Sequence, residues 1–351
     1  MKYIVFTYND LPTINIGDYI QSIAARQYMD SNVVFVNRDE LGKYDGDKAK
    51  VIMNGWYTYN PSCCLPNERV TPLFIAFHLN ADAEKSFLTP GNIAILQKYA
   101  PIGCRDIHTT EVLQNKGIDA YFSGCLTTTL GYAHSFKVTP KNNDIFIVDP
   151  YSYLPNGKNI YELTRTLCQL IGNFKSIRRL IGKYKQENPF TINLSKVGIG
   201  RLLLVTKTYV LLKKICEKDV IWKARYITQW YMNSEYPTDE SRFKRAYELL
   251  QLYAGAKYVI SSRIHCAFPC LGLQTPVAFV KNNAGGEKST CRLDSISELL
   301  NVVELDKERV VFNFLKDKKF SMKTTFTNKL TYLDNRNKLI QKCIDFINLQ
   351  K

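Results

Sequence analysis

Short apolar runs that end in small polar residues recur along the chain and predict a parallel sheet with covering helices. Lys2–Thr7 alternates apolar and polar side chains and predicts a first strand, and Tyr19–Met29 has apolar positions at helical spacing. Val33–Val36 and Val51–Met53 predict two more strands, the second of which runs into Asn54. A strand, a loop, a helix and a strand in this order form the βαβ unit of an α/β fold. In such folds ligands bind at the carboxyl ends of the strands.

The stretch Tyr258–Val280 is the clearest unit of this kind. Tyr258–Ile260 has the pattern of a short buried strand and stops before Ser262, so Arg263 and His265 are expected just beyond its carboxyl end. A small apolar helix and another strand follow. The unit therefore presents a cation and a titratable ring together. A surface ion pair for the arginine and a structural role for the histidine at the helix start are the alternatives.

The length of the chain predicts two domains. Its 351 residues exceed the ~100–200 residues of a typical domain, and the turn-rich stretch Pro150–Gly157 is a natural place for the first to end. Apolar residues at helical spacing in the tail predict an amphipathic helix lying across the domains. The predicted parts are an N-terminal domain, a basic helical segment or linker, a C-terminal domain and the tail helix, at residues 1–155, 156–225, 226–319 and 320–351.

Positive charge is concentrated in the middle of the chain. The formal net charge is +15, and residues 156–225 carry fifteen Lys or Arg against four acids. Such a segment favours an anionic partner, which could be nucleic acid, a phosphorylated substrate or an acidic membrane surface. A solvated basic face on lysine-rich helices is the alternative. Nucleic-acid binding has no support beyond this charge, because the aromatic residues form no recognisable recognition motif.

The ten cysteines do not form a metal or disulfide pattern. The sequence has no CxxC pair, and Cys266 and Cys270 lie on an apolar helix, so buried thiols in a reducing cytosol are expected rather than a zinc site. The chain opens with a strand-like segment instead of a signal peptide, and no run of about 18 uncharged apolar residues appears. The sequence predicts a cytoplasmic protein that does not span a membrane and needs no metal.

Three loops share a glycine next to an aspartate, an arginine or a small hydroxyl. They are Gly17-Asp18, Gly103–Asp106 and Ser123-Gly124-Cys125, and in a parallel sheet they would converge on one cleft. Their backbone N–H groups and arginine suit a phosphate or a carboxylate. Neither GxGxxG after the first strand nor GxxxxGK[ST] occurs, so a dinucleotide site or a P-loop has little support. The alternative is turn chemistry, with Asp18 and Asp106 capping helices.

Taken together, these blocks resemble the polysaccharide pyruvyl transferase family in order and spacing. The similar blocks are INIGDYIQSIAARQYM, VIMNGWY, PIGCRDIHTTEVLQNKGIDAYFSGCLTTTL and RFKRAYELLQLYAGAKYVISSRIHCAFPCLGLQTPVAFV, over roughly residues 1–135 and 240–300. The resemblance implies two Rossmann-like domains facing a central cleft, as in GT-B glycosyltransferases. It also implies phosphoenolpyruvate as donor, a sugar or lipid-linked oligosaccharide as acceptor, no cofactor, and a pyruvate ketal on an exopolysaccharide or capsule unit as product.

The chemistry of such a transfer can be matched to residues. Phosphoenolpyruvate carries a phosphate and a carboxylate, and ketal formation needs a proton delivered to its methylene carbon, so the site needs arginines and an acid. His265 suits the acid, and Arg263 suits the donor's carboxylate or phosphate. By resemblance, both map onto the family's Arg-x-His donor motif. Further donor-binding candidates are Arg105, Arg292 and Ser262, and acceptor or cleft candidates are Gly17, Asp18, Asn54, Asp106, Ser123 and His78.

One block departs from the family pattern. Many relatives have Thr-His in the strand that opens the second domain, where this chain has Thr228-Gln229, so the role of that histidine cannot be transferred. Another histidine, His108, is expected to face solvent. The rival enzyme class is a GT-B glycosyltransferase that uses a nucleotide sugar. Two features argue against this class: the Arg263–His265 block, and the absence of a carboxylate motif that would bind the base and ribose of a nucleotide.

An acceptor built on a lipid carrier would be met at the inner face of the membrane. The basic segment 156–225 is therefore expected to bring the protein into peripheral contact with anionic lipid.

Overall fold

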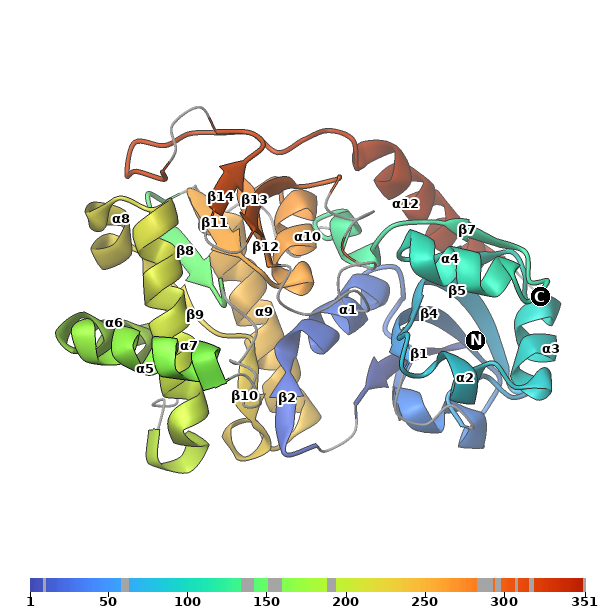
Figure 1. The fold of residues 1–351 in the computed structure, drawn as a ribbon. Helices are drawn as coiled ribbons and strands as arrows, with labels where there is room; N and C mark the ends of the chain where they lie inside the picture. The colour runs from blue at the N-terminus through green and yellow to red at the C-terminus, as the bar shows by residue number, and fades with distance from the viewer. Residues whose placement is uncertain are drawn as a thin grey trace.

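Two six-stranded sheets form the centre of the molecule (Figure 1). The computed structural model describes residues 1–8, 11–57, 63–133, 142–150, 160–187, 194–282, 293, 298–306, 309–315 and 319–349. The first sheet has the order β3-β1-β4-β5-β6-β7 and is parallel throughout. The second has the order β14-β13-β12-β11-β8-β9 and is parallel except for β14. The predicted α/β fold with parallel sheets is confirmed.

The elements of the first sheet come mainly from the first third of the chain. Its strands are β1 (Lys2–Thr7), β3 (Val33–Asn37), β4 (Ala49–Tyr57), β5 (Val70–Leu79), β6 (Ile102–Cys104) and β7 (Ala120–Phe122). The helices of this part are α1 (Ile16–Arg26), η1 (Arg38–Lys43), α2 (Glu84–Phe87), α3 (Pro90–Lys98), α4 (Ile107–Gln114) and η2 (Leu126–Thr129).

The second sheet is built from β8 (Ile145–Val148), β9 (Arg225–Ile227), β11 (Tyr258–Ser261), β12 (Val277–Asn282), β13 (Asn301–Asp306) and β14 (Arg309–Phe312). An antiparallel pair, β2 (Thr13–Asn15) with β10 (Trp230–Met232), joins the two halves of the chain. The remaining helices are α5 (Ile160–Gly172), α6 (Phe174–Glu187), α7 (Leu194–Ile215), α8 (Lys218–Lys223), η3 (Asn233–Glu235), α9 (Asp239–Gly255), α10 (Ile264–Gly272) and α12 (Leu333–Asn348).

Strand β8 corrects the predicted grouping of the chain. The sequence groups this strand with residues 1–155, whereas the structure pairs it with β9 and β11 in the second sheet. All four of its residues are buried, as are all four of β11, which is typical of parallel strands covered on both faces. An apolar run identifies such a strand, but it does not carry the information on which neighbours the strand will have.

Helix α1 begins earlier than the sequence predicts. The side chain of Asn15 accepts a hydrogen bond from the backbone N–H of Gly17 at 3.1 Å and caps the helix, which starts at Ile16 instead of Tyr19. Asp18 consequently lies in the first turn and does not cap it. This frees its carboxylate for another role.

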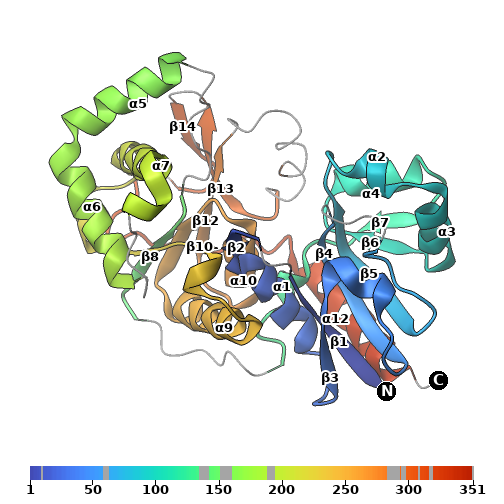
Figure 2. The ribbon, with the colours of Figure 1, turned by 90° about the horizontal axis from the view of Figure 1, so that it is seen from below.

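Helix α1 also ties the first half of the chain to the second. It lies beside α9 and α10 (Figure 2), and Ile20 belongs to the same buried cluster as Leu250 and Phe268. The Tyr19 hydroxyl donates to Asp239 Oδ1 at 2.6 Å and accepts from Arg242 Nη1 at 3.0 Å. The start of α1 is thereby held against the first turn of α9, the helix that precedes β11.

The basic segment is helical, as predicted, and it covers the second sheet. Leu180 on α6 and Leu212 on α7 share a buried cluster with Ile147 of β8 and Tyr226 of β9. The tail helix is confirmed only for Leu333–Asn348. Within the described ranges, no helix is long and apolar enough to cross a bilayer.

Candidate active site

The carboxyl ends of strands from both sheets supply the candidate site. Arg105 follows β6 of the first sheet, whereas Asp149, Gln229 and Arg263 follow β8, β9 and β11 of the second. Hydrogen bonds link each of these four side chains to another of them or to His265. The site therefore lies where ligands bind in open α/β sheets.

The position of His265 is set by a break in helix α10. Its φ of −81° and ψ of 18° are not helical, and the residue four positions later is Pro269, which has no N–H to donate to the His265 carbonyl. The side chain of Gln229 satisfies that carbonyl instead, at 3.0 Å, and also contacts the Tyr253 hydroxyl at 3.1 Å. Gln229 thus holds the backbone of His265.

The ring of His265 faces an arginine from the other sheet. Arg105 is 4% exposed, and its Nη1 lies 3.4 Å from His265 Nε2 and 3.5 Å from Gln21 Oε1. Because a guanidinium can only donate, Nε2 acts as the acceptor, and the neutral ring carries its proton on Nδ1 in this state. To act as an acid, His265 must take up a second proton at Nε2.

Gly17 allows α1 and α10 to meet. A Cβ built on this glycine would lie 2.9 Å from His265 Cβ, closer than real side chains approach, and 3.2 Å from His265 Nδ1. Because Gly17 has no side chain, the first turns of these two helices, one from each half of the chain, can approach closely.

Arg263 is positioned by Asp149, a residue that the sequence analysis does not include among the candidates. Arg263 Nε donates to Asp149 Oδ2 at 3.1 Å, the Ser262 hydroxyl donates to the Asp149 carbonyl at 2.6 Å, and Gln229 N donates to Asp149 Oδ2 at 2.9 Å. Asp149 has a positive φ of 39°, a strained conformation for a residue with a side chain. The surrounding contacts hold it there, so Asp149 fixes both Arg263 and Ser262.

Asp18 is a partly buried carboxylate beside these cations. Burial raises its pKa from 3.8 to about 6, although the charges of Arg38 and Arg105 and a hydrogen bond from Gln21 at 3.1 Å act in the opposite direction. A carboxylate with this pKa is ionised at neutral pH and can still accept a proton readily. This is the property of a general base.

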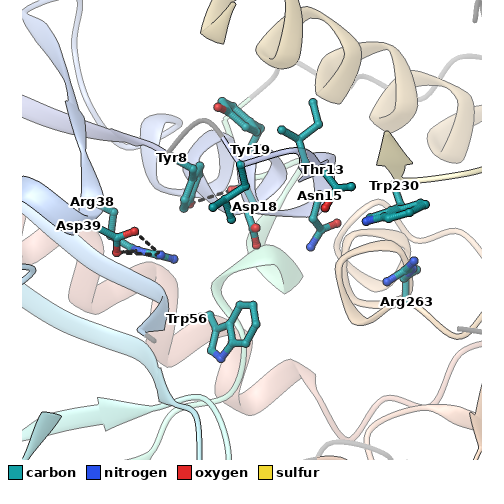
Figure 3. A pocket seen from close by; sticks show the side chains of 12 residues that line it. Tyr8, Thr13, Asn15, Asp18, Tyr19, Arg38, Asp39, Trp56, Trp230 and Arg263 are labelled. Atoms are coloured by element: carbon teal, nitrogen blue, oxygen red, sulfur yellow. Dashed lines mark hydrogen bonds and ion pairs between the residues drawn. The ribbon is translucent and has the colours of Figure 1, made fainter. Parts of the chain in front are cut away.

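A pocket of about 260 Å³ opens beside Asp18 and Arg263 (Figure 3). It receives side chains from both halves of the chain. Those that line it are Tyr8, Leu11, Thr13, Ile14, Asn15, Asp18, Tyr19, Arg38, Asp39, Trp56, Trp230 and Arg263. Asp18 and Arg263 both line it, so the pocket opens at the carboxyl end of β11.

Four of the predicted cleft residues are buried in structural contacts. His78 Nδ1 lies 2.6 Å from Asp106 Oδ2, and Asp106 also caps α4 by accepting from Thr109 N at 2.9 Å. Burial by itself would raise the pKa of Asp106, but the hydrogen bond and charge of His78, together with Arg105, lower it to about 2. The side chains of Ser123 and Asn54 bond to backbone groups at 3.0–3.1 Å and are at most 5% exposed.

Of the other predicted residues, Arg292 lies outside the described part of the chain. His108, expected to face solvent, is 29% exposed, and its Nε2 lies 2.7 Å from Glu84 Oε1. In the described ranges, no three His, Cys, Asp or Glu side chains gather as metal ligands would. That the reaction needs no metal stays a prediction.

A family model of polysaccharide pyruvyl transferases matches residues 15–283. The match contains α1, Arg105, Asp149, Gln229 and the Arg263–His265 block. The chain belongs to the polysaccharide pyruvyl transferase family. A comparison with curated proteins found no match. Membership of the family makes the chain a transferase of polysaccharide biosynthesis with a sugar as acceptor.

Asp149, Trp56 and Trp230 are site residues that were not predicted from the sequence. Two signals were present: Asp149-Pro150 ends an apolar strand, and Trp56 follows Asn54-Gly55 at the end of another. A polar or aromatic residue at the end of a buried parallel strand is a candidate for ligand contact, whatever its chemistry.

Proposed function

We propose that this family member transfers the pyruvyl group of phosphoenolpyruvate to two hydroxyls of a sugar, forming a pyruvate ketal in exopolysaccharide or capsule biosynthesis. The observation that carries the proposal is the grouping of Arg105 and His265, 3.4 Å apart, with Arg263 two residues away on the same helix start. Two arginines and an imidazole suit a small trianionic donor that must also be protonated.

The donor would bind to the arginines through its two anionic groups. Among the described residues, Asp149 contacts Arg263 through Nε, and the terminal nitrogens suit bidentate binding of a carboxylate or phosphate. Arg105 would turn from His265 towards the donor, which would leave Nε2 able to take up a proton. Ser262 and Arg292 complete the proposed donor-binding set.

In the proposed mechanism, imidazolium Nε2–H of His265 protonates the methylene carbon, and the double-bond electrons form the new C–H bond. One sugar hydroxyl attacks the resulting cationic carbon and gives its proton to Asp18. Phosphate then leaves with the C–O bonding electrons, and a second hydroxyl closes the ketal. Of the two hydroxyl protons, one replaces the proton that His265 delivered and the other leaves on phosphate, so both residues are restored.

We further propose that the two sheets are the centres of two Rossmann-like domains that face a central cleft, as in GT-B glycosyltransferases. The convergence of strand ends from both sheets supports this arrangement. Since β8 pairs in the second sheet, the proposed boundary moves from residue 155 to a point before Ile145.

Donor choice can be tested by thermal unfolding. Phosphoenolpyruvate at a hundredfold excess over its Kd should stabilise the fold by about 2.7 kcal/mol and raise Tm by a few degrees, whereas nucleotide sugars should not. Arg263→Lys should reduce this rise in Tm, because the point charge of an ammonium replaces a guanidinium that can form two parallel hydrogen bonds. Arg69→Lys, at an exposed position, is the control. A rise in Tm with a UDP- or GDP-sugar and none with phosphoenolpyruvate would favour a glycosyltransferase.

We also propose peripheral contact with an anionic membrane through α5 and α6. These helices lie at the outer edge of the molecule (Figure 2). Ile160, Tyr161, Ile171 and Phe174 are 77%, 76%, 77% and 57% exposed. Exposed basic residues continue this surface along α6, namely Lys175, Arg178, Arg179 and Lys185. Apolar side chains beside a basic face are typical of helices that lie on a membrane.

The membrane surface predicts a variant that separates binding from catalysis. Ile171→Asp with Phe174→Asp should abolish most binding to vesicles rich in phosphatidylserine and leave turnover of a soluble acceptor unchanged. Salt should weaken the wild-type binding, because each basic residue near such a surface contributes about 1 kcal/mol. Leu330→Asp, at another exposed apolar position, is the control. Equal vesicle binding by the double variant and the wild type would refute this surface.

A further inference from the structure

Two of the three tryptophans in the chain line the same pocket. Trp56 lies on β4 of the first sheet, and Trp230 lies on β10, which pairs with β2 (Figure 3). Both side chains are only partly buried. The guanidinium of Arg201 lies over the Trp230 ring, 5.1 Å from its centroid, and is itself 8% exposed, so a buried cation restrains this ring. Flat aromatic surfaces are therefore presented by two separate elements.

Carboxylates outnumber arginines by one around these rings. Arg38 binds Asp39 through two hydrogen bonds of 3.0 and 3.1 Å, and Arg263 binds Asp149 at 3.1 Å. Each lining arginine already contacts a carboxylate, and Asp18 adds another carboxylate. An acidic sugar whose carboxylate lay beside Asp18 would be repelled, whereas hydroxyl groups can donate to the Asp18 carboxylate.

The size of the pocket limits its ligand. Its volume of about 260 Å³ lies just below the roughly 300–1,000 Å³ of sites for drug-sized ligands. One sugar ring fits this scale better than an oligosaccharide or a nucleotide sugar does. A pyranose also has the required shape, because its C–H face packs on aromatic rings while its hydroxyls point outwards from its edge.

We propose that this pocket binds one uncharged pyranose unit of the acceptor, with its C–H face against Trp56 and Trp230 and its reacting hydroxyls towards Asp18. The inference rests on the proposed function and adds to it the acceptor class and the two tryptophans as specificity-determining residues. The sugar ring sits between the sheets, and the donor arginines lie beside Asp18 at the same opening.

Intrinsic tryptophan fluorescence offers a direct test, since only one tryptophan lies outside the pocket lining. Wild-type protein without donor should show saturable fluorescence changes with at least one of methyl galactoside, methyl glucoside and methyl mannoside, and not with glucuronic acid or UDP. Trp222→Phe should keep the response, because Trp222 stacks with Arg179 at 4.2 Å on the outer helices. Trp56→Leu and Trp230→Leu should each weaken binding about tenfold.

Two further measurements keep the result unambiguous. Saturation-transfer NMR of the same glycosides measures binding independently of the removed fluorophore, and Trp230→Tyr should restore most of the affinity by restoring an aromatic face. No binding of any of the three glycosides at tens of millimolar, or unchanged affinity in both leucine variants, would overturn the proposal. Glycoside binding without any stabilisation by phosphoenolpyruvate would refute the donor proposal and leave the pocket proposal standing. Turnover by Trp230→Leu with an unchanged acceptor KM would refute the proposal that this pocket binds the acceptor and leave the proposed reaction standing.

Discussion

His265→Ala is expected to fold normally and to lose about 10²–10⁴ in turnover, the usual contribution of a positioned acid. The physical reason is that the proposed reaction begins with proton delivery to the donor's methylene carbon, and the ring lies between Arg105 and Gly17. His265→Gln should be nearly as slow, because an amide can hydrogen-bond but cannot supply the proton. The measurement is turnover per folded molecule at saturating donor, alongside a melting curve.

A matched control is available for this variant. His108 is paired with Glu84 at 2.7 Å, and His108→Ala should leave turnover unchanged. If His265 is only a structural residue, its alanine variant should melt at lower temperature while the folded fraction works at the normal rate. Such a result would remove His265 from the mechanism.

Asp18→Asn is expected to make the protein more stable near neutral pH and to slow it by about 10²–10⁴. The pKa of Asp18 is raised from 3.8 to about 6, so the folded protein binds this proton more tightly than the unfolded chain does. Stability therefore falls as pH rises from about 4 to about 6, and the loss is complete above that range. The uncharged amide of the Asn variant does not ionise, so the variant keeps the free energy of unfolding that the wild type loses, about 1–3 kcal/mol.

The wild-type pH profile provides a second readout of Asp18. Turnover should fall as pH decreases through about 6, because the protonated carboxyl cannot accept the hydroxyl proton. Asp45→Asn, at an exposed position, should change neither the profile nor the stability. An Asp18→Asn enzyme with normal turnover and an unaltered acid limb would show that this carboxyl only shapes the pocket.

The sequence predicts the strands and helices that carry the site better than it predicts the contacts between them. Tyr258–Ile260 and the residues after it are recognisable because a buried parallel strand is continuously apolar and its end is polar, and the structure confirms this strand and helix. The family resemblance is likewise confirmed over residues 15–283. Both depend on local order along the chain.

The pairing across the sheets could not be predicted in this way. Arg105 and His265 are 160 positions apart, and their contact depends on the packing of α1 against α10. The role of Asp18 depends on which residue caps α1, and an Asn and an Asp three positions apart are both good caps. Asp106 and His78 have the composition of a catalytic pair, but burial at 1–2% exposure makes them a structural one.

The most direct test is to incubate the purified protein with phosphoenolpyruvate and a glycoside or lipid-linked sugar that has two neighbouring free hydroxyls, and to weigh the product. The proposed function predicts an acceptor heavier by pyruvic acid less one water, with one phosphate released for each ketal formed and no product from His265→Ala. An acceptor that gains a sugar from a UDP- or GDP-sugar, with no phosphate released from phosphoenolpyruvate, would contradict it.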